Sequence, residues 1–289
     1  MFVCRAGVHS FVTVLCLAFG PLLAQAQPLN GAADALPPAQ AQALVNRALN
    51  EELRMAQDEI AQSHPMRFKL RKTSPRLTTT KEIVETRDGN VARLEAINDQ
   101  PLNQADEQKE QARLEALLRD PSLQRHRKNA ESQDESIVLK VMRMLPRAFI
   151  YQYAGAAMGP AGRVEKFTFK PNPQFSPPDL ETQALTAMTG ELWIDAAEGR
   201  VARLAGSLQQ DTDYGWGILG KLNKGGWIEI EQGDVGGHAW RITHVQLKMS
   251  LRILFKNKIF DTDEQMREYA AVPPGIDYRQ AIHILRGSK

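Results

Sequence analysis

The chain has 289 residues, of which 43% are hydrophobic and 24% are charged, and its formal net charge is +2. Both cysteines, Cys4 and Cys16, lie in an N-terminal segment that we expect to be removed, and loss of Arg5 with it lowers the basic count from 36 to 35, against 34 acidic residues. In the mature chain this composition excludes disulfides, cysteine nucleophiles and cysteine metal sites, and it provides no basic surface for nucleic acid.

The first 26 residues have the pattern of a secretory signal peptide. Arg5 supplies the positive charge, an apolar run follows over residues 11–23, and Ala24-Gln25-Ala26 matches the small-residue cleavage motif. The run is too short for a transmembrane helix, and Leu15 does not match the small residue that precedes the cysteine of a lipoprotein signal. We therefore predict cleavage after Ala26 and a location in a bacterial periplasm.

Beyond a Pro-Ala linker over residues 27–40, apolar residues recur at helical spacing and predict one face of a helix. These residues are Val45, Leu49, Leu53, Ala56 and Ile60. The predicted helix ends before Pro65, because the residue that precedes a proline is driven out of the helical conformation.

We expect a helical insertion at about residues 103–146. Its first part, residues 103–119, is predicted to be a polar helix, and residues 120–134 are charged and predicted to be mobile. A further helix is predicted to end at Pro146 and to cover the sheet with an apolar stripe. The stripe consists of Val138, Val141, Met142 and Leu145.

The remaining segments alternate apolar and polar residues with a period of two, which predicts β-strands. The predicted strands are residues 66–71, 78–86, 91–97, 149–153, 167–169, 190–195, 200–208, 226–231, 239–260 and 261–271. Asp88-Gly89-Asn90 is predicted to form a hairpin turn, and the tail over residues 273–289 is predicted to add a helical turn or a strand. We conclude that residues 41–289 form one α+β domain, a strongly curved antiparallel sheet (a half-open β-barrel) with helices packed on its concave side.

The stretch of residues 239–260 is the longest of these and is predicted to be a single strand. Apolar residues occupy every second position from Val245 to Phe255. Trp240 is out of step with this alternation, so we predict a β-bulge near Thr243. We expect these apolar side chains to be covered by a helix, by a second sheet or by an apolar ligand.

The sequence contains no convincing catalytic, cofactor or metal motif. Residues 215–220 match GxGxxG, but the glycines at 225 and 226 prevent a following helix, and Leu222 stands where a P-loop needs a hydroxyl group. The histidines have no metal-ligand spacing, and no serine lies in a GxSxG elbow. We expect no cofactor, no metal and no enzymatic activity.

Apolar residues of the predicted strands are the candidate ligand-binding residues. A concave apolar face either packs as ordinary core or lines a cavity. The candidate cavity residues are Phe68, Phe149, Tyr151, Tyr153, Phe167, Phe169, Trp193, Val245, Leu247 and Met249.

The glycine-rich connection of residues 209–226 is a candidate flap over this face, because its glycines leave the backbone free to swing. The apolar underside of the flap would consist of Trp216, Ile218, Leu219 and Leu222. A short helix or a bulged hairpin docked permanently on the sheet is an equally good interpretation.

Residues 190–203, GELWIDAAEGRVAR, resemble a hairpin of the LolA-like superfamily, in which a strand ending in aspartate turns into a strand with a V-x-R motif. That superfamily contains periplasmic lipoprotein carriers and RseB-type and LppX-type proteins, and the whole chain is also similar to a family of secreted bacterial proteins built this way. The resemblance implies a half-open barrel with an apolar cavity beneath its helices. The cavity arginine of the carriers matches no residue here, so the resemblance implies a fold and a ligand class but no carrier activity.

Two functions agree with these expectations. The first is a periplasmic binding protein that holds a lipid, an acyl chain or another apolar ligand in the cavity. The alternative is an envelope structural, interaction or sensor protein that has a filled core, binds no ligand and contacts another envelope protein. A deep apolar cleft between helix and sheet would favour the first function, and a closed core would favour the second.

Overall fold

The computed structural model describes residues 36–61, 64–214, 220–253 and 256–287. Its helices are α1 (Pro38–Ile60), α2 (Gln104–Arg119), α3 (Pro121–Ala148), α4 (Leu180–Gln183) and α5 (Tyr278–Gly287), with a 3-10 helix η1 (Ala184–Ala187). Its strands are β1 (Met66–Ser74), β2 (Leu77–Val84), β3 (Val91–Ile97), β4 (Gln100–Pro101), β5 (Phe149–Gly159), β6 (Gly162–Pro171), β7 (Met188–Asp195), β8 (Val201–Leu208), β9 (Thr212–Tyr214), β10 (Gly220–Leu222), β11 (Trp227–Asp234), β12 (Trp240–Ile253) and β13 (Lys256–Ala271).

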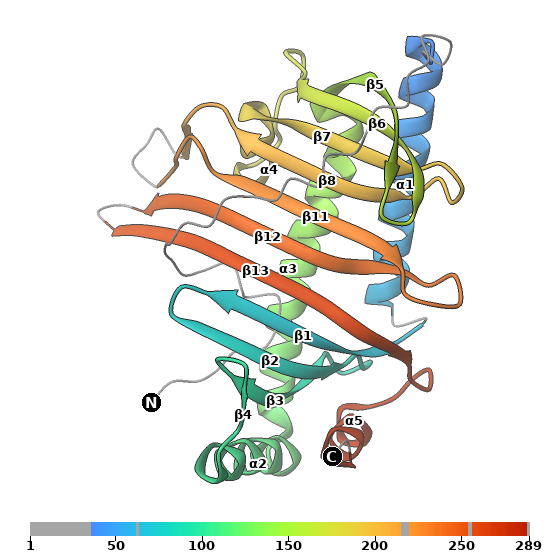
Figure 1. The fold of residues 1–289 in the computed structure, drawn as a ribbon. Helices are drawn as coiled ribbons and strands as arrows, with labels where there is room; N and C mark the ends of the chain where they lie inside the picture. The colour runs from blue at the N-terminus through green and yellow to red at the C-terminus, as the bar shows by residue number, and fades with distance from the viewer. Residues whose placement is uncertain (1–35, 62–63, 215–219, 254–255, 288–289) are drawn as a thin grey trace.

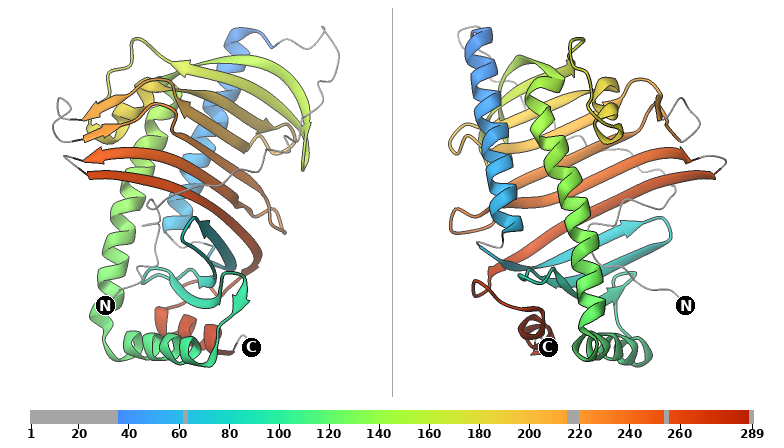
Figure 2. Two further views of the ribbon diagram at one scale, coloured as in Figure 1. Left: turned by 60° about the vertical axis from the view of Figure 1, so that its left-hand side comes forward. Right: turned by 180° about the vertical axis from the view of Figure 1, so that it is seen from behind.

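All of these strands belong to one antiparallel sheet (Figure 1). Across the sheet they follow the order β4-β3-β2-β1-β13-β12-β11-β8-β7-β6-β5, while β9 and β10 extend it beside β12. The two outermost strands, β4 and β5, do not pair with each other, so the barrel is open. The sheet is strongly curved, and α1 and α3 cross its concave side (Figure 2). The predicted α+β half-barrel is therefore confirmed.

The largest of three hydrophobic cores, called the larger core below, lies between α1, α3 and the strands β5 to β8. α1 contributes residues at helical spacing, among them Val45 and Leu49, which are almost completely buried. The strands contribute aromatic rings, such as Phe149 and Phe169, whose ring centres are 4.6 Å apart. This core fixes both helices against one half of the sheet.

A smaller core lies at the other end of the sheet, where α2 and α5 pack near β2 and β3 (Figure 1). The helix that was predicted to be polar is α2, and its Leu114 and Leu117 are buried in this core. α5 was expected to be no more than a helical turn or a strand. It has ten residues, because its buried residues recur at the spacing of a helix face: Tyr278, Ala281, Ile282 and Leu285.

The prediction of one strand over residues 239–260 is wrong, because the chain turns back after Ile253 and pairs Ile253 with Lys256. The apolar alternation continues up to the turn and so conceals it, and Phe255 lies outside the described residues. The bulge within this stretch is confirmed. Glu231 pairs with His244 and Gln232 with Ile242, which leaves Thr243 as the extra residue.

The helical insertion is more regular than expected. The charged segment of residues 120–134 is helical, because the turn between β2 and β3 holds it: Gln124 donates to the main-chain oxygens of Asp88 and Gly89, each at 3.0 Å. Pro146 does not end α3, since a proline in the last turn removes only one helical hydrogen bond. At the other helix, α1 begins at Pro38 and so includes the end of the predicted linker.

Candidate functional site

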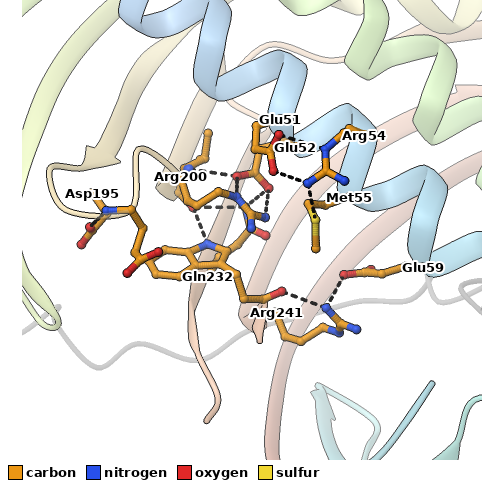
Figure 3. A network of polar contacts seen from close by, with 12 residues as sticks. Glu51, Glu52, Arg54, Met55, Glu59, Asp195, Arg200, Gln232 and Arg241 are labelled. Atoms are coloured by element: carbon orange, nitrogen blue, oxygen red, sulfur yellow. Dashed lines mark hydrogen bonds and ion pairs between the residues drawn. The ribbon is translucent and has the colours of Figure 1, made fainter. Parts of the chain in front are cut away.

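Two glutamates on α1, the buried Glu52 and the partly exposed Glu59, anchor this helix to the sheet (Figure 3). Glu52 accepts hydrogen bonds from Nε and Nη2 of Arg200, at 2.7 and 3.0 Å, and from the main-chain N–H of Val201 at 3.0 Å. Glu59 pairs with Arg241 at 3.0 Å. Residues seven apart lie on the same face of a helix, so both anchors face the strands.

A pocket of about 870 Å³ lies beside the first of these anchors, between α1 and the ends of β6, β7 and β8. Leu44, Tyr153 and Ile194 line it and also belong to the larger core or pack against it, so the pocket borders that core. Trp240 adds an aromatic side chain to the wall. Pockets that bind small molecules have volumes of about 300–1,000 Å³ and are mostly apolar with a few placed polar groups.

The polar groups inside the pocket already have partners. Tyr153 donates its hydroxyl hydrogen to Glu165 at 2.5 Å, and Nε of Arg163 donates to the same carboxylate at 3.1 Å. Asp195 accepts the main-chain N–H groups of Ala197 and Glu198 in the turn between β7 and β8, at 2.9 and 2.8 Å. These contacts hold the side chains of the wall in place.

The mouth of the pocket is charged and exposed. Arg47 of α1 lines it and has no ion pair with a described residue. Glu51 lines the same wall, and its hydrogen bond from Arg54 holds the pKa of Glu51 below its ordinary value. His238 lines the opposite side of the mouth. The wall of the pocket therefore combines apolar side chains with charged ones.

Nothing in the described residues indicates a metal centre or a membrane span. No group of three or more His, Cys, Asp or Glu side chains in that part of the chain could hold a metal ion. No helix within the same residues is long and apolar enough to cross a bilayer.

Of the predicted cavity residues, Tyr153 alone lines this pocket. Four others lie in the larger core, less than 10% exposed and covered by α1 and α3: Phe149, Tyr151, Phe167 and Phe169. These aromatic rings do lie on the face of the sheet that the helices cover. They pack against α1 and α3 there, whereas the prediction had them line a ligand cavity.

Val245, Leu247 and Met249 lie on the helix-facing side of β12. Val245 is in register with Ile230 and Leu204, and Leu204 packs against the larger core. Leu247 is buried, whereas Val245 and Met249 are only half-buried. We call Ile230, Val245 and Met249 the central apolar surface, because helices cover it less than they cover β5 to β8.

α3 passes this part of the sheet without covering it fully. Val138 is 43% exposed, although Glu131 and Leu145, seven residues to either side on the same helix face, are buried or packed against the core. The predicted stripe of α3 is thus correct at Val141 and Leu145 and wrong at Val138. Met144 takes part in the contact with the larger core instead of Met142.

Trp193 does not face the helices, contrary to the prediction. Its neighbours Leu192 and Ile194 point into the larger core, so the alternation of the strand directs Trp193 to the helix-free face. There its ring lies between Lys166 and Arg203, at 4.8 and 4.7 Å, in a second pocket of about 1310 Å³.

Phe68 is far from both pockets. It stacks on Tyr269 of β13, with ring centres 4.9 Å apart. Of the predicted flap residues, Leu222 is buried and lies in β10, which pairs with β9 and β12. Trp216, Ile218 and Leu219 lie outside the described residues, so the flap stays a prediction.

The anchoring glutamates were not among the predicted site residues, although a signal for them was present. Glu52 and Glu59 continue the helical spacing of Val45 and Leu49, so both fall on the apolar stripe of α1. A carboxylate on the buried face of a helix indicates a buried partner. The partners, Arg200 and Arg241, are far away in sequence and could not be named without the fold.

No protein-family model matches the chain, and no curated protein matches it. Among solved structures, the chain is similar to a domain from Vibrio parahaemolyticus that is provisionally described as an outer membrane lipoprotein-sorting protein. The similarity covers 86% of this chain and 100% of that chain, with 8% sequence identity and a TM-score of 0.31. We base no argument on a likeness of this degree.

Proposed function

We propose that the protein is a periplasmic binding protein that holds the apolar chain of an amphipathic ligand, such as a lipid or a free acyl chain, in the pocket beside α1. The observation that carries this proposal is that Leu44, Tyr153 and Ile194 form part of the wall of the pocket and also pack in the larger core. A chain that enters the pocket extends that core, and each buried CH₂ group stabilises the complex by about 0.8 kcal/mol.

The charged mouth suits the polar end of such a ligand. Arg47, Glu51 and His238 lie at the entrance, where a head group stays in contact with water. Because Glu165 and Asp195 inside the pocket are already hydrogen-bonded, we propose binding without catalysis.

Protein purified from the cell envelope and examined by native mass spectrometry is expected to carry a lipid-sized adduct. A fluorescent fatty acid, used as the probe, is expected to bind the protein after the adduct has been extracted. The proposal fails if the purified protein carries no adduct and the extracted protein does not bind the probe.

Leu44→Trp places a larger side chain in the pocket and is expected to weaken binding of the probe at least tenfold. Ala43→Trp is the matched control, since Ala43 is exposed on the same helix and does not line the pocket. Thermal unfolding of both variants shows whether they fold. Equal affinity of the two variants would place the ligand elsewhere.

An envelope interaction or sensor protein without a ligand is the second candidate. The close packing of Phe149, Tyr151, Phe167 and Phe169 under α1 and α3 favours it, because these rings pack against helices and do not line a cavity. Absence of an adduct, together with cross-linking of the protein to a different envelope protein, would support this candidate.

A further inference from the structure

The two edges of the sheet are protected to very different degrees. An edge strand carries a row of main-chain N–H and C=O groups that can pair with another chain. At one edge, β4 has two residues and ends in Pro101, which has no main-chain N–H group. At the other edge, β5 runs for eleven residues along the margin of the sheet (Figure 1).

The sequence of β5, FIYQYAGAAMG, contains none of the residues that usually block an edge. It has no lysine, no other charged residue and no proline. Ile150 is 43% exposed and Met158 is 54% exposed, so apolar side chains accompany the open edge. A bulge between Tyr153 and Gly155 interrupts the strand and leaves the residues before it as a regular segment.

Main-chain groups of this regular segment point away from the sheet. The N–H group of Asn172 donates to the oxygen of Ala148 at 2.8 Å, and hydrogen-bonded pairs alternate with non-bonded pairs along an antiparallel ladder. The next bonded pairs are therefore those of Ile150 and Gln152 with β6. The N–H and C=O groups of Phe149 and Tyr151 then point outward, where no described strand pairs with them.

We propose that β5 pairs in antiparallel fashion with β5 of a second copy of this chain, so that two sheets become one. Two observations select this partner. The edge formed by β4 is blocked, so pairing through β5 closes after two copies, as in a symmetric dimer. The uncharged sequence of β5 also brings no like charges together when it pairs with itself.

The test uses protein exported from the full chain and purified from the envelope, with mass measured by sedimentation equilibrium. The wild type is expected at twice the monomer mass. Ile150→Lys combined with Gln152→Lys places like charges on both partner strands and is expected to give monomers, as is the combination of Ile150→Glu with Gln152→Glu. A mixture of the two double variants is expected to restore the dimer mass, since the strands then carry opposite charges.

Ile242→Lys is the control, because Ile242 is 38% exposed on β12, which has a neighbour strand on each side. This variant is expected to remain dimeric. Circular dichroism shows whether each variant keeps its sheet. A monomeric wild type, double-lysine variants that remain dimeric, or a mixture that stays monomeric would each overturn the proposal.

Discussion

His244 is the centre of a charged row on the helix-free face of the sheet. Its Nε2 atom lies 3.2 Å from Asp263 and its Nδ1 atom 3.6 Å from Glu231. The carboxylate of Asp263 and the more distant carboxylate of Glu231 raise the pKa of His244 to about 10. The imidazole is therefore positively charged at neutral pH and links β11, β12 and β13.

Replacement of this histidine by an uncharged residue should remove part of the pH dependence of stability. A raised pKa stabilises the folded state fully below the ordinary value of 6.5, and the contribution is lost as the pH rises through about 10. His244→Gln is expected to cost about 1 kcal/mol below pH 6.5 and almost nothing above pH 10. Urea unfolding at both ends of this range measures the difference, and an equal cost at both would contradict the assignment.

Glu85 gives a second pH dependence at lower pH. Burial raises the pKa of Glu85 from 4.5 to about 7, in spite of a 2.8 Å hydrogen bond from the N–H group of Met66. Its charged neighbours are Glu59, Arg241 and Glu131. The protonated carboxyl group is thus favoured in the folded state.

The free energy of unfolding is therefore expected to fall as the pH rises from 4.5 to about 7. The decrease attributable to Glu85 is at most roughly 3 kcal/mol, at 1.36 kcal/mol per pKa unit. Glu85→Gln keeps an acceptor for the N–H group of Met66 and should flatten the profile in this range. A profile that keeps its slope in the variant would show that another group titrates there.

At the scale of elements, α1 depends on the buried pair of Glu52 and Arg200. Glu52→Ala leaves Arg200 buried without its partner, and it is expected to cost about 3–5 kcal/mol of stability. Replacement of both residues by leucine removes both buried charges and is expected to cost clearly less. Chemical unfolding of the single and the double variant makes the comparison. Equal losses would mean that packing of α1, and not the ion pair, holds the helix.

Periodicity predicted those elements whose apolar residues face one neighbour. α1 and most strands were predicted because Val45 and Leu49, or Phe167 and Phe169, repeat at the spacing of one buried face. The division between β12 and β13 was missed because the alternation runs unbroken up to the turn. The length of α5 was missed although Tyr278, Ala281, Ile282 and Leu285 carry the signal of a helix.

The candidate site was less predictable than the fold. The face of a strand residue follows from alternation, so Tyr153 and Leu247 were placed on the correct side. Whether a helix then covers such a residue depends on contacts between distant segments, which local spacing does not contain. Glu52 and Arg200 are 148 residues apart in the sequence, and only the fold brings them together.

At the scale of the whole molecule, the helices cover the concave side unevenly. α1 and α3 cover one end over β5 to β8, and α2 and α5 cover the other end near β2 and β3. The central apolar surface belongs to β11 and β12, which lie between these two ends in the order of the sheet, and its side chains are only half-buried.

The pairing of β1 with β13 also constrains when the protein can fold. Lys72 and Glu264 lie 2.7 Å apart across these strands but are separated by 192 residues in the sequence, so a very long loop must close before they meet. During synthesis, which starts at the N-terminus, β1, β2 and β3 therefore remain without their neighbouring strand β13 until almost the whole chain is available. The sheet can thus become continuous only when the chain is nearly complete.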